Sequence, residues 1–151
     1  MRRLCGKSSP LCCIAARTRS IALALRRPFI DVSTDMRLVL KALKAREQIF
    51  AVIDVPADQV TASQPIQVLG LPARLPTALL RLAVDRQVPV FLYVTGFRVA
   101  DGQRFVRIQQ LGVPTDLDSL VRQVAEELDR TIQQDAPQWH FWSEAERFFR
   151  G

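Results

Sequence analysis

The chain has 151 residues, of which 48% are hydrophobic, 24% charged and 7% aromatic. This composition excludes an intrinsically disordered or fibrous protein, and the length predicts one domain with a sizeable core. The net charge of +6 is concentrated at one end: residues 1–28 hold seven basic and no acidic groups, whereas the remaining 14 basic and 15 acidic groups sum to −1. Because the basic residues are confined to an arm and not interleaved with aromatic ones, we expect no nucleic-acid partner.

Residues 1–28 are interpreted as a basic, disordered arm, and residues 29–151 as the folded domain. The arm contains four arginines that are candidates for contacting an anionic membrane surface: Arg17, Arg19, Arg26 and Arg27. A functionless extension, an organellar transit peptide or a misassigned start would have the same composition. The best apolar run, Ile21–Leu25, is far shorter than a membrane-spanning helix requires.

All three cysteines, Cys5, Cys12 and Cys13, also lie in the arm. Their spacing suits neither a zinc site nor a disulfide framework, so we expect reduced thiols and a cytoplasmic compartment. The sequence predicts no metal site and no cofactor.

The first regular element is an amphipathic helix that begins near Met36 and repeats its apolar residues at helical spacing. Ser33–Asp35 supply capping residues, and lysines near the far end suit the helix dipole. Ile49–Ile53 is β-branched and aromatic, which predicts a short buried strand that ends at Asp54.

A proline-containing loop then leads to a brief extended piece, Ile66–Leu69, which Gly70 and Pro72 are expected to break. A second helix is predicted to begin near Pro76 and to end around Arg86, with a broad apolar face.

Val88–Val94 is nearly all apolar, which is typical of a strand covered on both faces. The Asp101-Gly102 pair after it predicts a hairpin, because Asp-Gly readily adopts the positive φ of a tight turn. In this hairpin we expect Val106 and Ile108 to face inward, opposed by Arg107.

A long amphipathic helix is predicted after Pro114, followed by Pro137 and a short aromatic tail. Alternating helices and strands with one hairpin indicate an α/β fold, with a mixed sheet flanked by helices in two or three layers.

Four segments resemble, in order and spacing, the second half of the lipid A biosynthesis (late) acyltransferase family of the lysophospholipid acyltransferase superfamily. The family has a strand that ends in aspartate, an "F-x-G-x-P-A-x-x-P-T-G" segment and a closing "P-E-Q-W-x-W" signature. The segments that carry the resemblance are Ile49-Phe-Ala-Val-Ile-Asp54, Val68-Leu-Gly-Leu-Pro-Ala-Arg-Leu-Pro-Thr77, Val88-Pro-Val-Phe-Leu-Tyr-Val94 and Ala136-Pro-Gln-Trp-His-Phe-Trp142. Ala78 replaces the family's glycine, Pro137-Gln138 replaces its Pro-Glu-Gln, and Val55-Pro56-Ala57 replaces the polar residue and glycine that usually follow the aspartate.

The resemblance implies the C-terminal half of an acyltransferase-like sandwich. It also implies an acyl carrier protein or acyl-coenzyme A as donor, a lipid A precursor or related glycolipid as acceptor, and a position peripheral to the inner membrane on its cytoplasmic side. The family's catalytic H-x4-D motif, in which histidine is the general base and aspartate orients it, is missing. The single histidine, His140, has Ala145 at the aspartate position. We therefore predict no catalytic residue in this chain, which is interpreted as a fragment or a divergent paralogue.

Three residues are candidates for substrate binding: Asp54, Arg74 and Arg81. Aspartates at strand ends are common in α/β binding sites but also cap loops. A guanidinium group could hold a phosphate or carboxylate, or it could belong to a solvated helix face. Two functions of different class stay open: an acyltransferase or its substrate-binding half, and a non-catalytic lipid-associated or remnant domain.

Overall fold

The computed structural model describes residues 36–59 and 62–149, and the chain divides between Ala51 and Val52 into two units that are described separately. The arm 1–28 and the capping residues Ser33–Asp35 lie outside the described residues.

The described part of the first unit contains helix α2, Met36–Lys44, as predicted. Val39 is its buried residue, and Lys41 and Lys44 lie in its last turn, where they suit the helix dipole. The prediction of a strand at Ile49–Ile53 is wrong, since this segment forms neither a helix nor a strand. Phe50 and Val52 are 70% and 61% exposed, so the apolar run does not enter a sheet in the way its composition suggested.

The second unit begins with a hairpin of β1, Ser63–Val68, and β2, Leu71–Pro76. The two-residue turn, Leu69-Gly70, has φ angles of 55° and 73°, as a type I′ turn requires. The Leu69 amide donates to Asp129 Oδ1 at 2.5 Å, which fixes the turn to a helix 60 residues away. The extended piece predicted at Ile66–Leu69 overlaps β1, but β2 was not predicted, because Gly70 and Pro72 were expected to break the strand and Pro76 to begin a helix.

Three prolines fit this hairpin because of where their missing N–H groups would point. Val68 and Leu71 flank the two-residue turn and form a hydrogen-bonded pair. By alternation, Pro65, Pro72 and Pro76 fall at positions whose backbone faces away from the partner strand. The prolines therefore cost no ladder hydrogen bond, and they remove donors from both outer edges.

Helix α3, Ala78–Arg86, follows as predicted and ends at Gln87, which adopts a left-handed conformation. A second hairpin of β3, Val90–Arg98, and β4, Gln103–Gly112, turns at Asp101-Gly102, also as predicted. The longest helix, α4, covers Leu117–Gln134, and its N-cap Asp116 accepts a 2.7 Å hydrogen bond from the Ser119 amide.

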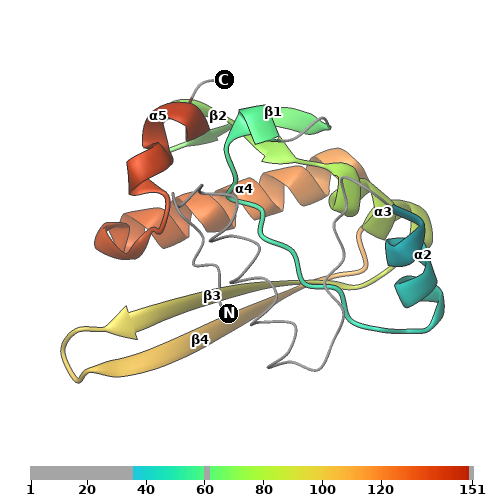
Figure 1. Ribbon diagram of the computed structural model, residues 1–151, viewed down its shortest axis with the longest axis horizontal. Helices are drawn as coiled ribbons and strands as arrows, with labels where there is room; N and C mark the ends of the chain where they lie inside the picture. The colour runs from blue at the N-terminus through green and yellow to red at the C-terminus, as the bar shows by residue number, and fades with distance from the viewer. Residues whose placement is uncertain (1–35, 60–61, 150–151) are drawn as a thin grey trace, which may run out of the picture. The chain divides into compact units, whose positions relative to one another are not determined.

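Helix α4 lies between the two hairpins (Figure 1) and supplies side chains to both hydrophobic clusters of the unit. Leu120, Val121 and Val124 pack with Leu75 and Leu80 near its N-terminal half. The C-terminal half contributes to a second cluster, which consists of Val68, Ala73, Leu128, Ile132 and Phe148. Full burial of each such side chain contributes roughly 1.5–3 kcal/mol, so α4 is the main organiser of the core.

The side chains of β4 point in the opposite directions to those predicted. Val106 and Ile108 are 63% and 67% exposed, whereas Arg107 reaches across to α4. Phe91 and Tyr93 are also exposed, so β3 is covered on one face rather than on two. The apolar composition of the strand was correctly read as β structure, but Phe91 and Tyr93 on its second face are 53% and 44% exposed.

The chain ends in two 3₁₀ turns, Ala136–Gln138 and Trp142–Glu144, and the short helix α5, Ala145–Phe148. The described residues thus combine four α-helices with two small antiparallel sheets, in agreement with an α/β composition. Both described sheets are two-stranded and antiparallel, so the expected mixed sheet is not seen in this part of the chain.

We predict that Asp129→Ala lowers the free energy of unfolding by about 1.5–3 kcal/mol, because it leaves the Leu69 amide without its charged acceptor. Urea unfolding followed by circular dichroism measures the change. Glu126→Ala is the matched control, since this exposed carboxylate lies on the same helix. An equal loss in both variants would mean that the turn does not depend on Asp129.

Candidate functional site

The candidate residue Asp54 is held by the aromatic tail. The indole Nε1–H of Trp139 donates to Asp54 Oδ2 at 3.1 Å, across 85 residues of sequence. Asp54 lies just before the loop that leads to β1, and Trp139 lies just after the 3₁₀ turn Ala136–Gln138. The segment expected to end in a functional aspartate and the closing aromatic signature therefore meet in the structure.

Partial burial raises the pKa of the Asp54 carboxyl above its ordinary value of 3.8. The largest cause is desolvation, which disfavours the charged form. A backbone hydrogen bond, the Trp139 hydrogen bond and the attraction of His140 oppose the shift without cancelling it. Asp54 therefore holds its proton more readily than an ordinary aspartate does.

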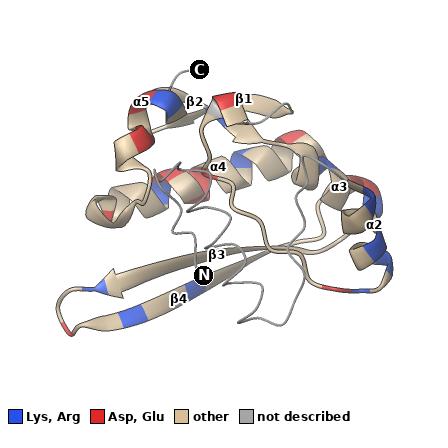
Figure 2. Cartoon of the chain, in the orientation of Figure 1, with Lys and Arg blue, Asp and Glu red and all other residues tan. Residues whose placement is uncertain are grey.

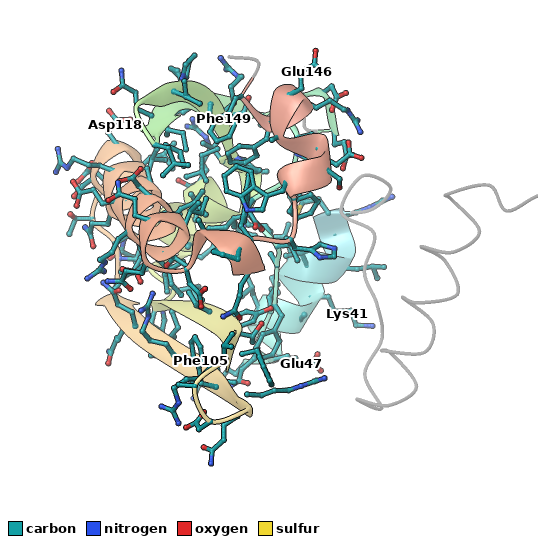
Figure 3. The ribbon with its side chains drawn as sticks, turned by 90° about the vertical axis from the view of Figure 1, so that its left-hand side faces the viewer. Lys41, Glu47, Phe105, Asp118, Glu146 and Phe149 are labelled. Carbon is teal, nitrogen blue, oxygen red and sulfur yellow. The ribbon has the colours of Figure 1, made fainter. Side chains whose placement is uncertain are left out.

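Trp139 is the centre of an aromatic cluster that closes this end of the unit. Its ring meets Trp142 and Phe148 edge-on, with centroid distances of 4.9 and 5.0 Å, and Phe149 lies 5.8 Å away. Figure 3 shows Phe149 beside α5 and the β1–β2 hairpin. Phe148 thus belongs to the core cluster of Val68 and Ile132, and Trp139 and Phe149 pack against it.

His140 is exposed, and its ring contacts Phe141 edge-on at 5.3 Å. Asp54 is close enough for His140 to lower its pKa, but the side chain that donates a hydrogen bond to its carboxylate is Trp139. The pairing that orients a catalytic imidazole through a carboxylate hydrogen bond is therefore not formed by these two residues.

The other two candidate residues lie apart from this aspartate. Arg74 is engaged across its own hairpin, where its Nε donates to Ser63 Oγ at 2.9 Å and its terminal nitrogen to the Ser63 carbonyl at 3.1 Å. Arg81 is exposed on α3. Neither arginine is among the groups that shift the pKa of Asp54, so the structure does not join the three into one charged site. The membrane candidates Arg17, Arg19, Arg26 and Arg27 lie outside the described residues.

Gln138 makes an unpredicted contact with strand β3. Its side-chain oxygen accepts from the Phe97 amide, and its side-chain nitrogen donates to the Phe97 carbonyl and to Asp135. One carboxamide thus satisfies both backbone groups of a strand residue, as a residue of a neighbouring strand would. The sequence does not predict this role, because a glutamine next to a tryptophan is not a pattern that indicates backbone pairing.

Glu127 is a second unpredicted feature, because its carboxylate is 5% exposed inside the apolar stripe of α4. Arg107 of β4 donates to it at 3.2 Å and also to Thr131 and Gln134, and Arg130 pairs with its other oxygen. Figure 2 shows acidic and basic residues along α4 and basic residues along β4. The ion pairs hold the distal half of the hairpin on the helix. The sequence does carry a signal for this role, because Glu127 is an acidic residue whose neighbours three positions before and one position after are apolar.

Arg147 of α5 forms a two-pronged pair with Asp58, with distances between 2.8 and 3.1 Å, and also contacts Glu144. These hydrogen bonds, first that with Asp58, raise the pKa of the Arg147 guanidinium further above its usual range. The loop after Asp54 is therefore held to the C-terminal helix α5 through Asp58.

A shallow depression of about 410 Å³ lies between β1 and α4, away from Asp54. Two of its three acidic residues are already engaged, since Asp118 accepts from Gln64 and Asp129 from Leu69, and the third is the exposed Glu126. Over residues 36–59 and 62–149 there is no cluster of three potential metal ligands. No helix in the same ranges is long and apolar enough to cross a membrane.

Comparison of the chain with family models, with curated protein sequences and with solved structures finds no match in any of the three.

We predict that Asp54→Asn stabilises the protein at neutral pH. Because burial raises the folded-state pKa, the unfolded chain releases the Asp54 proton above pH 3.8 while the folded chain still holds it. Stability of the wild type therefore falls as the pH rises from 3.8 to the folded pKa, and asparagine removes this loss while keeping an oxygen for Trp139.

The test is urea unfolding of both proteins in steps from about pH 3.5 to pH 7. The advantage of the variant should grow upward from pH 3.8 and then level off. Asp85→Asn on α3, at an exposed carboxylate, controls for the substitution. A variant that is less stable at pH 7 would show that the charged form of Asp54 is the favoured one.

Proposed function

We propose that this chain is an acyltransferase-family protein that resembles enzymes of lipid A biosynthesis and that binds a glycolipid or acyl donor without transferring the acyl group. Its fold is proposed to be the C-terminal half of an acyltransferase-like sandwich. The proposed donor is an acyl carrier protein or acyl-coenzyme A thioester, and the proposed acceptor is a lipid A precursor or related glycolipid. The proposed location is the cytoplasmic face of the inner membrane.

The observation that carries the proposal is the contact between segments that resemble the family. In the closing signature, Trp139 binds Asp54, at the end of the first resembling segment. Gln138 binds Phe97 in β3, the strand that contains most of the third. The second segment forms the β1–β2 turn and leads to α3. Segments that resemble the family thus contact one another in the structure. These contacts support the proposal that the segments come from a common ancestor with the family.

The missing chemistry supports the non-catalytic part of the proposal. An acceptor hydroxyl is a poor nucleophile until a base removes its proton, and general-base catalysis contributes on the order of 10²- to 10⁴-fold. The sequence has a single histidine, and that residue is exposed and lacks the H-x4-D aspartate. Asp54 is bonded to an indole rather than to an imidazole.

A non-catalytic, generally lipid-associated or remnant domain is the second candidate. It is favoured by the dispersal of Asp54, Arg74 and Arg81, which do not form one charged pocket. The two candidates differ in headgroup selectivity, since a substrate-binding domain prefers the glycolipid whereas general lipid association follows membrane charge.

We predict no acyl transfer by the purified chain. A labelled acyl-coenzyme A and the matching acyl carrier protein thioester are incubated with a lipid A precursor, and labelled product is separated by thin-layer chromatography. The expected result is the rate of the protein-free control. Product that disappears in His140→Ala would make the chain an enzyme and His140 its base.

We predict that vesicle binding requires residues 1–28, because these carry seven positive charges and the remainder sums to −1. Such attraction weakens as added salt shortens the Debye length from about 8 Å. Co-sedimentation compares the full chain with a chain that begins at Pro28, on phosphatidylglycerol vesicles and on vesicles of equal charge that contain the glycolipid. Equal binding by both chains at high salt would move the anchor to the folded domain, and a glycolipid preference would separate the proposed function from general lipid association.

A further inference from the structure

The turn of the β3–β4 hairpin exposes apolar side chains. Val99 is 82% exposed, and the flanking Phe97 of β3 and Val106 of β4 are 43% and 63% exposed. Arg107 reaches α4, and successive strand residues point to opposite faces, so Val106 lies on the face of β4 that is turned away from this helix. Figure 1 shows the turn beyond the end of α4. The hairpin therefore presents a projecting apolar end rather than a groove.

Several polar groups of this turn bond to one another. Arg98 donates to Asp101 Oδ2 at 2.7 Å and to Gln103 Oε1 at 3.2 Å. The Gly102 amide donates to the Arg98 carbonyl at 2.9 Å, and the Gln103 amide donates to Asp101 Oδ1 at 3.2 Å. Because a polar group that leaves water without gaining a partner is costly to bury, this internal bonding lowers the cost of moving the turn out of water.

The charged groups near the turn favour an anionic partner. Arg98 and Asp101 form an ion pair and compensate each other, so the charge of this end is set by Arg104. Arg104 is exposed, lies opposite Phe97 on the same face of the hairpin, and has no ion-pair partner within residues 36–59 and 62–149. A guanidinium group binds phosphate oxygens through forked hydrogen bonds. An apolar tip with a cation beside it matches the surface of an anionic bilayer, where phosphate groups lie above the acyl chains.

We propose that the turn of residues 98–103 inserts Val99 into an anionic lipid bilayer while Arg104 binds a lipid phosphate. The contact is shallow, because the compensated pair of Arg98 and Asp101 stays among the headgroups. A protein partner would need a hollow that matches this projecting end, whereas a fluid bilayer adapts to it. The inference rests on the membrane location in the proposed function and adds to it a contact made by the folded domain.

The basic arm and this turn supply different kinds of attraction. Residues 1–28 carry seven positive charges, whose attraction is long-range and is screened by salt. The turn contributes apolar burial, which acts only on contact and does not depend on charge. A polybasic segment and an apolar anchor together bind membranes more stably than either alone. We therefore expect the arm to bring the chain to the surface and the turn to account for the binding that remains at high salt.

Fluorescence of a label on the turn tests the contact directly. The full chain, with the three cysteines of the arm replaced by serine, carries either Val99→Cys or Asp85→Cys, and each is labelled with a nitrobenzoxadiazole dye. Asp85 is an exposed residue of α3 and is the matched control. On vesicles of phosphatidylglycerol and phosphatidylcholine, the emission of the dye at position 99 should shift to the blue, because the dye leaves water. The dye at position 85 should keep its emission.

Two variants of equal charge measure the contribution of the turn to binding. Val99→Asp and Val113→Asp each replace an exposed valine by the same acidic residue, so both change the net charge by the same amount. In high salt, where the attraction of the arm is screened, co-sedimentation with these vesicles should be about tenfold weaker for Val99→Asp than for Val113→Asp. Val99→Leu should bind at least as tightly as the wild type, since it keeps an apolar side chain. Circular dichroism checks that all three variants are folded.

Two results overturn this inference alone: a chain that sediments with the vesicles while the dye at position 99 keeps its aqueous emission, or equal binding by Val99→Asp and Val113→Asp. A wild-type chain that sediments with the vesicles at no salt concentration would overturn the membrane location of the proposed function as well. A blue shift at position 99 that grows with protein concentration in the absence of vesicles would assign the turn to a protein contact and overturn its assignment to lipid.

Discussion

The structure of the second unit depends on one constraint: a single helix, α4, has to pack against both hairpins. Its apolar side chains fill two clusters, one with β1–β2 and α5 and the other with α3 and the base of β3–β4. Its polar groups complete the same task, since Asp129 fixes the β1–β2 turn and Glu127 binds Arg107 of β4. A buried carboxylate is tolerated because two arginines compensate it, and removing those partners would leave an uncompensated charge. The hairpins have no direct sheet contact with each other, so the helix sets their spacing.

The predictability of each element followed from how local its determinants are. Helices α2, α3 and α4 and the Asp101-Gly102 hairpin were all predicted, because apolar spacing, capping and turn chemistry act within a few residues. Strand β2 was missed, since its prolines are harmless only in a particular register. The strand expected at Ile49–Ile53 failed for the reverse reason: β propensity does not supply a partner. Likewise, whether Val106 or Arg107 faces the core depends on Glu127, twenty residues away.

The candidate site was predictable in part. Asp54 was singled out from its place at the end of an apolar run. It does form a hydrogen bond with a residue far away in the sequence, Trp139, although the run is not a strand. Arg74 and Arg81 were chosen for their chemistry, yet chemistry does not reveal that Arg74 already spans its hairpin to Ser63. The residues that shape the site most, Gln138 and Arg147, act through pairs separated by 41 and 89 residues. Single-sequence patterns carry no information on such pairs.

The distance in sequence between Asp54 and Trp139 also has a consequence for synthesis on the ribosome. Trp139 is made 85 residues after Asp54, which at cellular elongation rates of about 5–20 residues per second is on the order of ten seconds later. Arg147 follows its partner Asp58 by a similar interval. Throughout that time the loop that contains both aspartates emerges into water without its anchors, and the carboxylate of Asp54 is fully hydrated and charged. Only when Trp139 and Arg147 have left the exit tunnel is this loop fastened, so the candidate site forms later than the parts of the second unit whose contacts are closer in sequence.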